Sequence, residues 1–316
     1  MEARTEGQSP TVVTHRQLRE HSHLRDLPLI EPDVPLHSLE KTGGERTIIQ
    51  IGEVEIGGPE IILMAGPCAL EDAKQIWDSA EAAKAAGAKI LRGGAFKPRT
   101  SPYSFQGMGE VGLKLQRLAA DQLGMLVVTE ATGERNVDIV AQYADIIQIG
   151  ARNAQSFDLL AKIGKTALEY NRAVLYKRGP SMSLQDWMWG AEYILATGCT
   201  NVILCERGTM MPSGSVDFDD AGVRAVRTLT HLPIIGDPTH ATKKSENVPG
   251  LAKRAIEANV DGLLIEIHPK PEAALCDGAR ALLPETLLAV ANGINDIAPK
   301  GRYFGVANGT IIYENK

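Results

Sequence analysis

The sequence repeats one unit from residue 61 onward: a short apolar run followed by a segment with apolar residues at helical spacing. The eight runs lie at residues 61–65, 88–91, 125–129, 146–149, 173–176, 201–205, 233–236 and 262–266. Segments between them, such as 72–86, 109–123, 183–196 and 248–259, have the pattern of amphipathic helices. Eight strand–helix units predict an α/β fold, a closed (β/α)8 TIM barrel over residues 59–298. An open doubly wound sheet is the alternative, because periodicity alone does not show closure.

The segments that flank the repeats differ from them. Residues 1–45 lack sustained periodicity and are predicted to be an extended N-terminal arm. Four histidines lie there (His15, His21, His23 and His37), but without cysteines or regular ligand spacing they do not indicate a metal site. Residues 46–58 hold two short apolar runs around a turn, which predicts a β-hairpin that caps the barrel. Residues 299–316 are predicted to be a C-terminal tail.

Composition limits the functions that such a chain can have. A chain of 316 residues that is 44% hydrophobic can bury a full core. Its net charge of −6 argues against nucleic acid or an anionic membrane as the main partner. We find no secretory signal and no apolar run long enough to span a membrane. The four scattered cysteines are therefore expected to be reduced thiols in a cytoplasmic protein.

A cationic segment, residues 91–107, follows the second apolar run. It contains three cations and two hydroxyls that can contact an anion: Arg92, Lys97, Arg99, Thr100 and Ser101. Guanidinium groups bind phosphate or carboxylate through paired donors, and an ammonium adds a point charge. A solvated basic turn is the alternative, but Pro98 and Pro102 restrict the backbone on both sides of Arg99. The segment therefore predicts an anion-binding loop.

Further cations come directly after other runs. Together with the first three they form one set: Arg92, Lys97, Arg99, Arg152, Lys177, Arg178 and Arg207. Both architectures place ligands at the carboxyl ends of the strands. Any single member could instead form a salt bridge. As a set in an acidic protein, these cations predict a polyanionic substrate or two phosphorylated small molecules.

A second set at the strand ends offers metal ligands. It consists of a thiol, an imidazole and two carboxylates: Cys68, His240, Glu266 and Asp277. A mixed sulfur, nitrogen and oxygen shell suits a divalent transition ion better than magnesium. Alone, Cys68 could be a small buried residue and His240 a hydrogen-bonded loop residue. No local spacing motif such as CxxC or HExxH joins the four.

Several short motifs resemble one enzyme family in unbroken order over residues 46–298. The most specific is KPRTSPYSFQG at residues 97–107. The others are Gly66-Pro67-Cys68, Gln148-Ile149-Gly150-Ala151-Arg152, Lys177-Arg178-Gly179, Cys205-Glu206-Arg207-Gly208 and Asp237-Pro238-Thr239-His240-Ala241. Together they resemble the 3-deoxy-D-arabino-heptulosonate 7-phosphate (DAHP) synthases, in the short microbial branch close to the 3-deoxy-octulosonate 8-phosphate synthases.

The resemblance implies a barrel that condenses phosphoenolpyruvate with erythrose 4-phosphate in the first step of aromatic biosynthesis. It implies Cys68, His240, Glu266 and Asp277 as ligands of a divalent metal ion, Mn²⁺ first, with Fe²⁺, Co²⁺ or Zn²⁺ as alternatives. Lys97, Cys68 and His240 would be catalytic. Substrate-binding residues would be Arg92, Lys97, Arg152, Lys177 and Arg207 for phosphoenolpyruvate, Arg99, Thr100 and Ser101 for the aldose phosphate, and Asp237 beside them. Relatives of this kind are dimers or tetramers.

The chain departs from the family pattern in three segments that we expect at the acceptor side of the mouth: 132–133, 180–182 and 209–215. A paralogue that uses a different aldose is therefore an alternative. A catalytically silent regulatory or binding barrel is another, but every metal and phosphate position is filled. The N-terminal arm lacks the pattern of a ferredoxin-like or chorismate mutase domain, so feedback control of those kinds is not expected.

Overall fold

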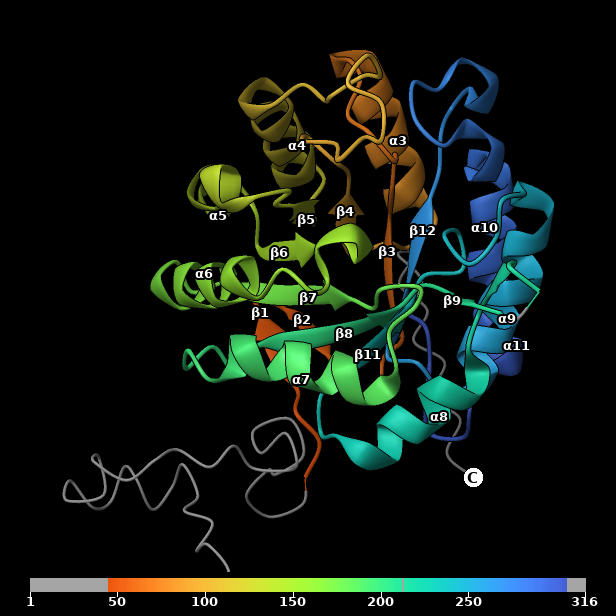
Figure 1. Ribbon diagram of the computed structural model, residues 1–316. Coiled ribbons are helices and arrows are strands. Elements are labelled where there is room, and N and C mark those ends of the chain that lie inside the picture. The colour runs from red at the N-terminus through yellow and green to blue at the C-terminus, as the bar shows by residue number, and fades with distance from the viewer. Residues whose placement is uncertain (1–44, 212, 306–316) are drawn as a thin grey trace, which may run out of the picture. The chain divides into compact units, whose positions relative to one another are not determined.

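The computed structural model describes residues 45–211 and 213–305. Residues 1–44 of the predicted arm (1–45) and residues 306–316 of the predicted tail (299–316) lie outside the described residues. Eight parallel strands form a closed barrel, in which β12 pairs with β3 to complete the ring (Figure 1). The strands are β3 (Ile62–Gly66), β4 (Ile90–Arg92), β5 (Leu126–Glu130), β6 (Ile146–Ile149), β7 (Ala173–Lys177), β8 (Val202–Glu206), β11 (Ile234–Gly236) and β12 (Gly262–Glu266). The predicted TIM barrel is confirmed, and the open sheet is excluded.

Helices surround the barrel (Figure 1). They are α3 (Ala73–Ala85), α4 (Glu110–Gln122), α5 (Val137–Tyr143), α6 (Phe157–Glu169), α7 (Leu184–Leu195), α8 (Asp220–Leu229), α9 (Val248–Glu257), α10 (Pro284–Asn292) and α11 (Ile294–Ile297). Helix α3 shows why they form where they do. The Asp72 side chain accepts a hydrogen bond from Gln75 N and caps the helix, and Ile76, Ala80 and Ala83 are buried.

The core has two layers because neighbouring strand residues point to opposite faces. In β3, Ile62 and Met64 pack inside the barrel, whereas Leu63 and Ala65 pack in the layer beneath the helices. Burial on both faces explains the continuous apolar runs.

A hairpin of β1 (Ile49–Ile51) and β2 (Val54–Ile56) precedes the barrel. Ile49 and Ile56 pair in register and join the interior layer of the barrel. Thr47 N donates to the backbone oxygen of His231, just ahead of β11 (2.8 Å). The hairpin therefore closes the end of the barrel where the strands begin.

Asp261, just ahead of β12, ties three segments together at that same end. Its fully buried carboxylate pairs with Arg46 (3.2 Å), Arg227 (3.1 Å) and Arg302 (2.9 Å). These arginines precede β1, lie on α8 and follow α11. One buried anion thus joins the N-terminal hairpin, a helix and the C-terminal segment to the barrel.

The opposite end carries the loops that follow the strands. A small hairpin of β9 (Thr209–Met210) and β10 (Val216–Asp217), absent from our sequence-based expectations, follows β8. Met210 N donates to the backbone oxygen of Pro180 (2.8 Å). Two of the three segments that depart from the family pattern therefore lie together. No described helix has the length and apolar character needed to cross a membrane.

Candidate active site

A cavity of about 470 Å³ opens where the barrel strands end. Nearly all of the predicted cations and hydroxyls line it: Arg92, Lys97, Arg99, Thr100, Ser101, Arg152, Lys177 and Arg207. His240 and Asp277 line it as well. Side chains from strand ends far apart in the sequence therefore meet in one space.

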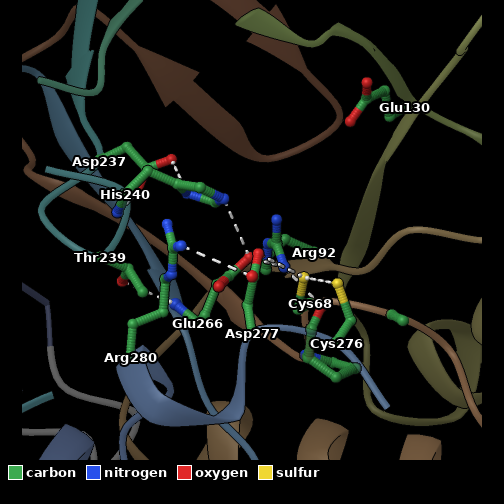
Figure 2. Close-up of polar contacts among 12 residues, drawn as sticks. Cys68, Arg92, Glu130, Asp237, Thr239, His240, Glu266, Cys276, Asp277 and Arg280 are labelled. Atoms are coloured by element: carbon green, nitrogen blue, oxygen red, sulfur yellow. Dashed lines mark hydrogen bonds and ion pairs between the residues drawn. The ribbon is translucent and has the colours of Figure 1, made fainter. Parts of the chain in front are cut away.

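The four predicted metal ligands lie close together (Figure 2), and two of them, His240 and Asp277, line the cavity. Ligand atoms of His240, Glu266 and Asp277 all lie within 4.8 Å of one another, and so do those of Cys68, Cys276 and Asp277. Asp277 belongs to both groups. Its backbone is left-handed (φ 56°), a conformation that Asp and Asn adopt more readily than most residues. The arrangement offers thiol, imidazole and carboxylate donors to a single ion.

The surroundings of the Glu266 carboxylate show whether this cluster suits a metal ion. It is 1% exposed, and neither oxygen has a hydrogen-bond partner among the described residues. Arg92 Nη1 lies 3.1 Å from Glu266 Oε1, but this ion pair lacks hydrogen-bond geometry. Although burial opposes ionisation, the nearby His240, Arg92 and Lys97 lower the pKa of Glu266 to about 2. Arg92 compensates part of this charge, but both carboxylate oxygens remain without the hydrogen bonds that a buried anion needs, and a further cation could bind them. The donor set therefore fits a divalent metal ion.

The turn after β11 fixes the ring of His240. Asp237 Oδ1 accepts from His240 N (3.0 Å), which forms a local turn, and Asp237 Oδ2 lies 2.7 Å from His240 Nδ1. His240 Nε2 then faces Glu266 Oε1 at 3.4 Å. Burial lowers the pKa of His240 despite the neighbouring carboxylates, which favours the neutral ring that metals bind.

Two thiols and one ammonium complete this side of the site. The sulfurs of Cys68 and Cys276 lie 3.0 Å apart, and Lys97 Nζ lies 3.2 Å from Cys68 Sγ. The contact with Cys276, together with burial, raises the pKa of Cys68, and the same contact lowers the pKa of Cys276. Burial would lower the pKa of Lys97, but both thiols and nearby carboxylates raise it overall. Lys97 therefore keeps its proton at neutral pH.

Two cavity cations, Arg152 and Arg207, form no ion pair with a carboxylate among the described residues. No ion pair or hydrogen bond of the Arg152 or Arg207 side chain is found among the described residues. Burial lowers the pKa of Arg207, the charge of Asp237 opposes this, and the nearby charge of Arg280 lowers it further. Lys177, by contrast, pairs with Asp237 (2.6 Å). Arg207 is partly buried and Arg152 is exposed, and guanidinium groups that line a cavity without partners indicate an anionic ligand.

The prediction that Arg178 belongs to the cationic set is wrong. Its guanidinium pairs with Glu206 (3.0 Å) and Asp219 (2.9 Å) and donates to the backbone oxygen of Met182. It is buried and does not line the cavity. Consecutive residues at a strand end point in opposite directions, so Lys177 faces inward and Arg178 faces the surrounding helices.

The sequence analysis assigned no site role to four lining residues: Glu130, Gln148, Cys276 and Arg280. Cys276 and Arg280 flank the predicted ligand Asp277, and Arg280 Nη2 lies 3.5 Å from Asp277 Oδ1. Glu130 stands apart from the metal-ligand cluster (Figure 2) and accepts a hydrogen bond from Gln148 (3.1 Å). The only sequence feature that could have pointed to each of these residues was its position beside a predicted ligand or near a strand end.

Comparisons with known proteins agree with this geometry. A model of the DAHP synthetase I family matches residues 40–299. A phospho-2-dehydro-3-deoxyheptonate aldolase of Thermotoga maritima is 47% identical over 240 residues, which are 75% of this chain and 70% of that protein. A solved structure of a Thermotoga maritima DAHP synthase superposes with a TM-score of 0.79 at 41% identity, covering 87% of this chain and 82% of that one. A 2-dehydro-3-deoxyphosphooctonate aldolase of Geobacter sulfurreducens is 30% identical over 268 residues, 79% of this chain and 97% of that protein.

Proposed function

Because the chain belongs to the DAHP synthetase I family, it condenses phosphoenolpyruvate with erythrose 4-phosphate to DAHP and phosphate, and we propose that a divalent metal ion serves this reaction. The enzyme is thus a DAHP synthase of the shikimate pathway. The observation that carries the proposal is the meeting of a metal-ligand cluster and unpartnered cations in one cavity. The higher identity to the heptonate aldolase than to the octonate aldolase supports the four-carbon acceptor.

Four side chains would hold the ion: Cys68, His240, Glu266 and Asp277. The Glu266 carboxylate, buried without a hydrogen bond among the described residues, supports this assignment. A set that includes a thiolate and an imidazole favours Mn²⁺, Fe²⁺, Co²⁺ or Zn²⁺ over magnesium, and we put Mn²⁺ first. When bound, the ion supplies a Lewis acid that polarises the aldehyde carbonyl of the acceptor.

Phosphoenolpyruvate would occupy the cationic part of the cavity. Its phosphate and carboxylate would contact Arg92, Lys97, Arg152, Lys177 and Arg207. Arg152 and Arg207 are the members without partners among the described residues, so they gain most from an anion. Asp237 would hold Lys177 Nζ and His240 Nδ1 through Oδ2, while its Oδ1 accepts from His240 N.

The acceptor's phosphate would lie against Arg99, Thr100 and Ser101, which line the cavity on the loop after β4. Two phosphorylated substrates repel each other in an uncompensated pocket. The cations between them offset that repulsion and bring the reacting carbons together.

The chemistry is a condensation that consumes water. The enol carbon of phosphoenolpyruvate attacks the aldehyde carbon and forms the new C–C bond, which leaves a cationic carbon next to the phosphate ester oxygen. Water adds there, and phosphate then departs to leave the 2-keto group. Lys97 keeps a proton on Nζ beside Cys68, so we assign it delivery of the proton to the new hydroxyl.

We also propose that the enzyme is a homo-oligomer, a dimer or tetramer as in the relatives that it resembles. The four cysteines are free, which supports a reducing, cytoplasmic setting. Mass measurement of the purified protein in solution tests the oligomeric state.

A phosphate-release assay tests the reaction and its metal dependence together. Purified enzyme is given phosphoenolpyruvate with each of a panel of aldose phosphates, with and without chelator. We expect turnover with erythrose 4-phosphate, loss of turnover with chelator, and recovery with Mn²⁺. Full activity in the chelated enzyme would refute the metal proposal. Turnover only with another sugar would refute the acceptor.

A further inference from the structure

Glu71 joins the two loops that carry the thiols of the site. It lies three residues after Cys68, between β3 and α3. Its Oε1 accepts from Leu275 N at 2.8 Å, across 204 residues of sequence. Its Oε2 lies 3.3 Å from His268 Nε2. Both side chains are nearly buried, with 9% of Glu71 and 8% of His268 exposed. One carboxylate therefore bonds to two points of the loop after β12.

The hydrogen bonds of His268 define how its ring is protonated. Lys270 N donates to His268 Nδ1 (3.0 Å), so Nδ1 is the acceptor and Nε2 carries the proton. Nε2 therefore donates to Glu71 Oε2. The backbone N of His268 donates to Leu282 O (3.0 Å). Each carboxylate oxygen of Glu71 and each ring nitrogen of His268 thus has one partner and one direction.

The bonded residues lie directly beside the proposed ligands. Leu275 precedes Cys276 and Asp277, and His268 follows Glu266 by two positions. Asp277 has a left-handed backbone, so the position of its carboxylate depends on the backbone of this loop. The hydrogen bond that Leu275 N donates to Glu71 fixes the position of this backbone relative to the Cys68 loop. A shift of the loop would move Asp277 away from Cys68, whose sulfur lies 3.5 Å from Asp277 Oδ2.

We propose that Glu71 and His268 are positioning residues that hold the Cys68 loop and the Cys276–Asp277 loop at the separation that a bound metal ion needs. This inference rests on the metal site of the proposed function. Neither residue touches the cavity, so their effect on the reaction passes through the metal ligands. Residues that orient metal ligands in this way typically change metal affinity by about 10- to 100-fold when they are replaced.

Glu71→Gln is the sharpest change. The glutamine oxygen can still accept from Leu275 N, but its amide nitrogen then faces the proton on His268 Nε2. Two hydrogen-bond donors, the glutamine amide and His268 Nε2, then face each other, so the bond to His268 is lost while the side-chain volume stays nearly the same. Glu81→Gln is the matched control, because Glu81 is an exposed carboxylate on α3, the helix that follows Glu71. His268→Gln keeps a donor and an acceptor, whereas His268→Leu keeps neither.

The experiment titrates full-length apoenzyme with Co²⁺, following binding by calorimetry and the thiolate-to-cobalt absorption band. We expect Glu71→Gln and His268→Leu to bind Co²⁺ about 10- to 100-fold more weakly than the wild type, with a weakened band. Glu81→Gln should match the wild type, and His268→Gln should retain more affinity than His268→Leu. Thermal unfolding of each apoenzyme separates a metal effect from a general loss of stability.

Unchanged Co²⁺ affinity and an unchanged band in both Glu71→Gln and His268→Leu would overturn the positioning role. If Glu71→Gln does not fold, the two His268 variants decide the question, and equal affinities for them would overturn it. Failure of the proposed metal site looks different. In that case the wild type itself shows no thiolate band, or shows one that persists in Cys68→Ser.

Discussion

The sulfurs of Cys68 and Cys276 lie 3.0 Å apart although 208 residues separate them in the sequence. The two thiols come from the loops after β3 and β12, which are neighbouring strands in the closed barrel. Their contact raises the pKa of Cys68 and lowers that of Cys276. In this pair the Cys68 thiol donates to the Cys276 sulfur, and the contact favours ionisation of Cys276 over Cys68, at the edge of the proposed metal site.

This pair predicts how the metal-free enzyme responds to oxidants. Hydrogen peroxide should join the two sulfurs, each thiol losing one hydrogen while the peroxide is reduced to two waters. We expect chelated enzyme to lose two free thiols. Bound Mn²⁺ should protect both, since Cys68 would then be a ligand of the ion. Thiol titration and intact mass measure the change. Cys276→Ser should not form the bond, and an equal loss of thiols in that variant would contradict the prediction.

Cys68→Ala and His240→Ala should lose metal and activity but keep the fold. Both residues lie at the mouth of the barrel, where side chains serve the site more than the core. Bound metal, turnover and circular dichroism are the measurements. Wholesale unfolding of either variant would show that the residue is needed for the barrel itself.

Arg207→Ala should raise KM for phosphoenolpyruvate. Its guanidinium has no partner among the described residues, and a hydrogen bond to a charged group contributes about 1.5–3 kcal/mol, or about 10- to 100-fold. Steady-state kinetics at saturating acceptor and Mn²⁺ test this. Arg224→Ala, on the exposed face of α8, is the control. Equal KM values for the two variants would remove Arg207 from the substrate site.

The barrel and most of the site could be predicted from the sequence, because parallel strands all end at the same mouth of the barrel. Knowing that Lys177 and Arg207 follow strands was enough to bring them together. It was not enough for Arg178, because the direction of a side chain depends on the exact strand register. Cys276 was missed because no spacing links it to Cys68, and their proximity arises only when β12 pairs with β3. Strands of two residues, such as β9 and β10, are too short to show the alternation of apolar and polar residues from which a strand is predicted.

Gly150→Ala should damage the site while leaving the barrel folded. A Cβ on Gly150 would lie 2.0 Å from Glu130 Oε1, so the Glu130 carboxylate must move and its bond from Gln148 (3.1 Å) would be lost. We expect kcat/KM for phosphoenolpyruvate to fall by about tenfold or more, the equivalent of one lost charged hydrogen bond. Gly133→Ala is matched to it, since a Cβ there meets nothing within 4 Å. Activity equal to that of the Gly133 variant would mean that the position of Glu130 does not matter.

Asp261→Asn should destabilise the protein far from the active site. The buried carboxylate holds three arginines from separate segments, and an amide cannot neutralise them, so like charges are left facing one another around a buried site. Breaking a buried ion pair costs about 3–5 kcal/mol, and we expect a loss of that order in the free energy of unfolding measured with urea. Asp78→Asn breaks an exposed pair with Lys74 on α3 and should leave the unfolding midpoint unchanged. Because Asp261 lies at the end of the barrel opposite the cavity, KM values for both substrates should stay as in the wild type. A stable Asp261→Asn variant would mean that hydrophobic packing of the hairpin, through Ile49 and Ile56, closes this end of the barrel without the ion pairs.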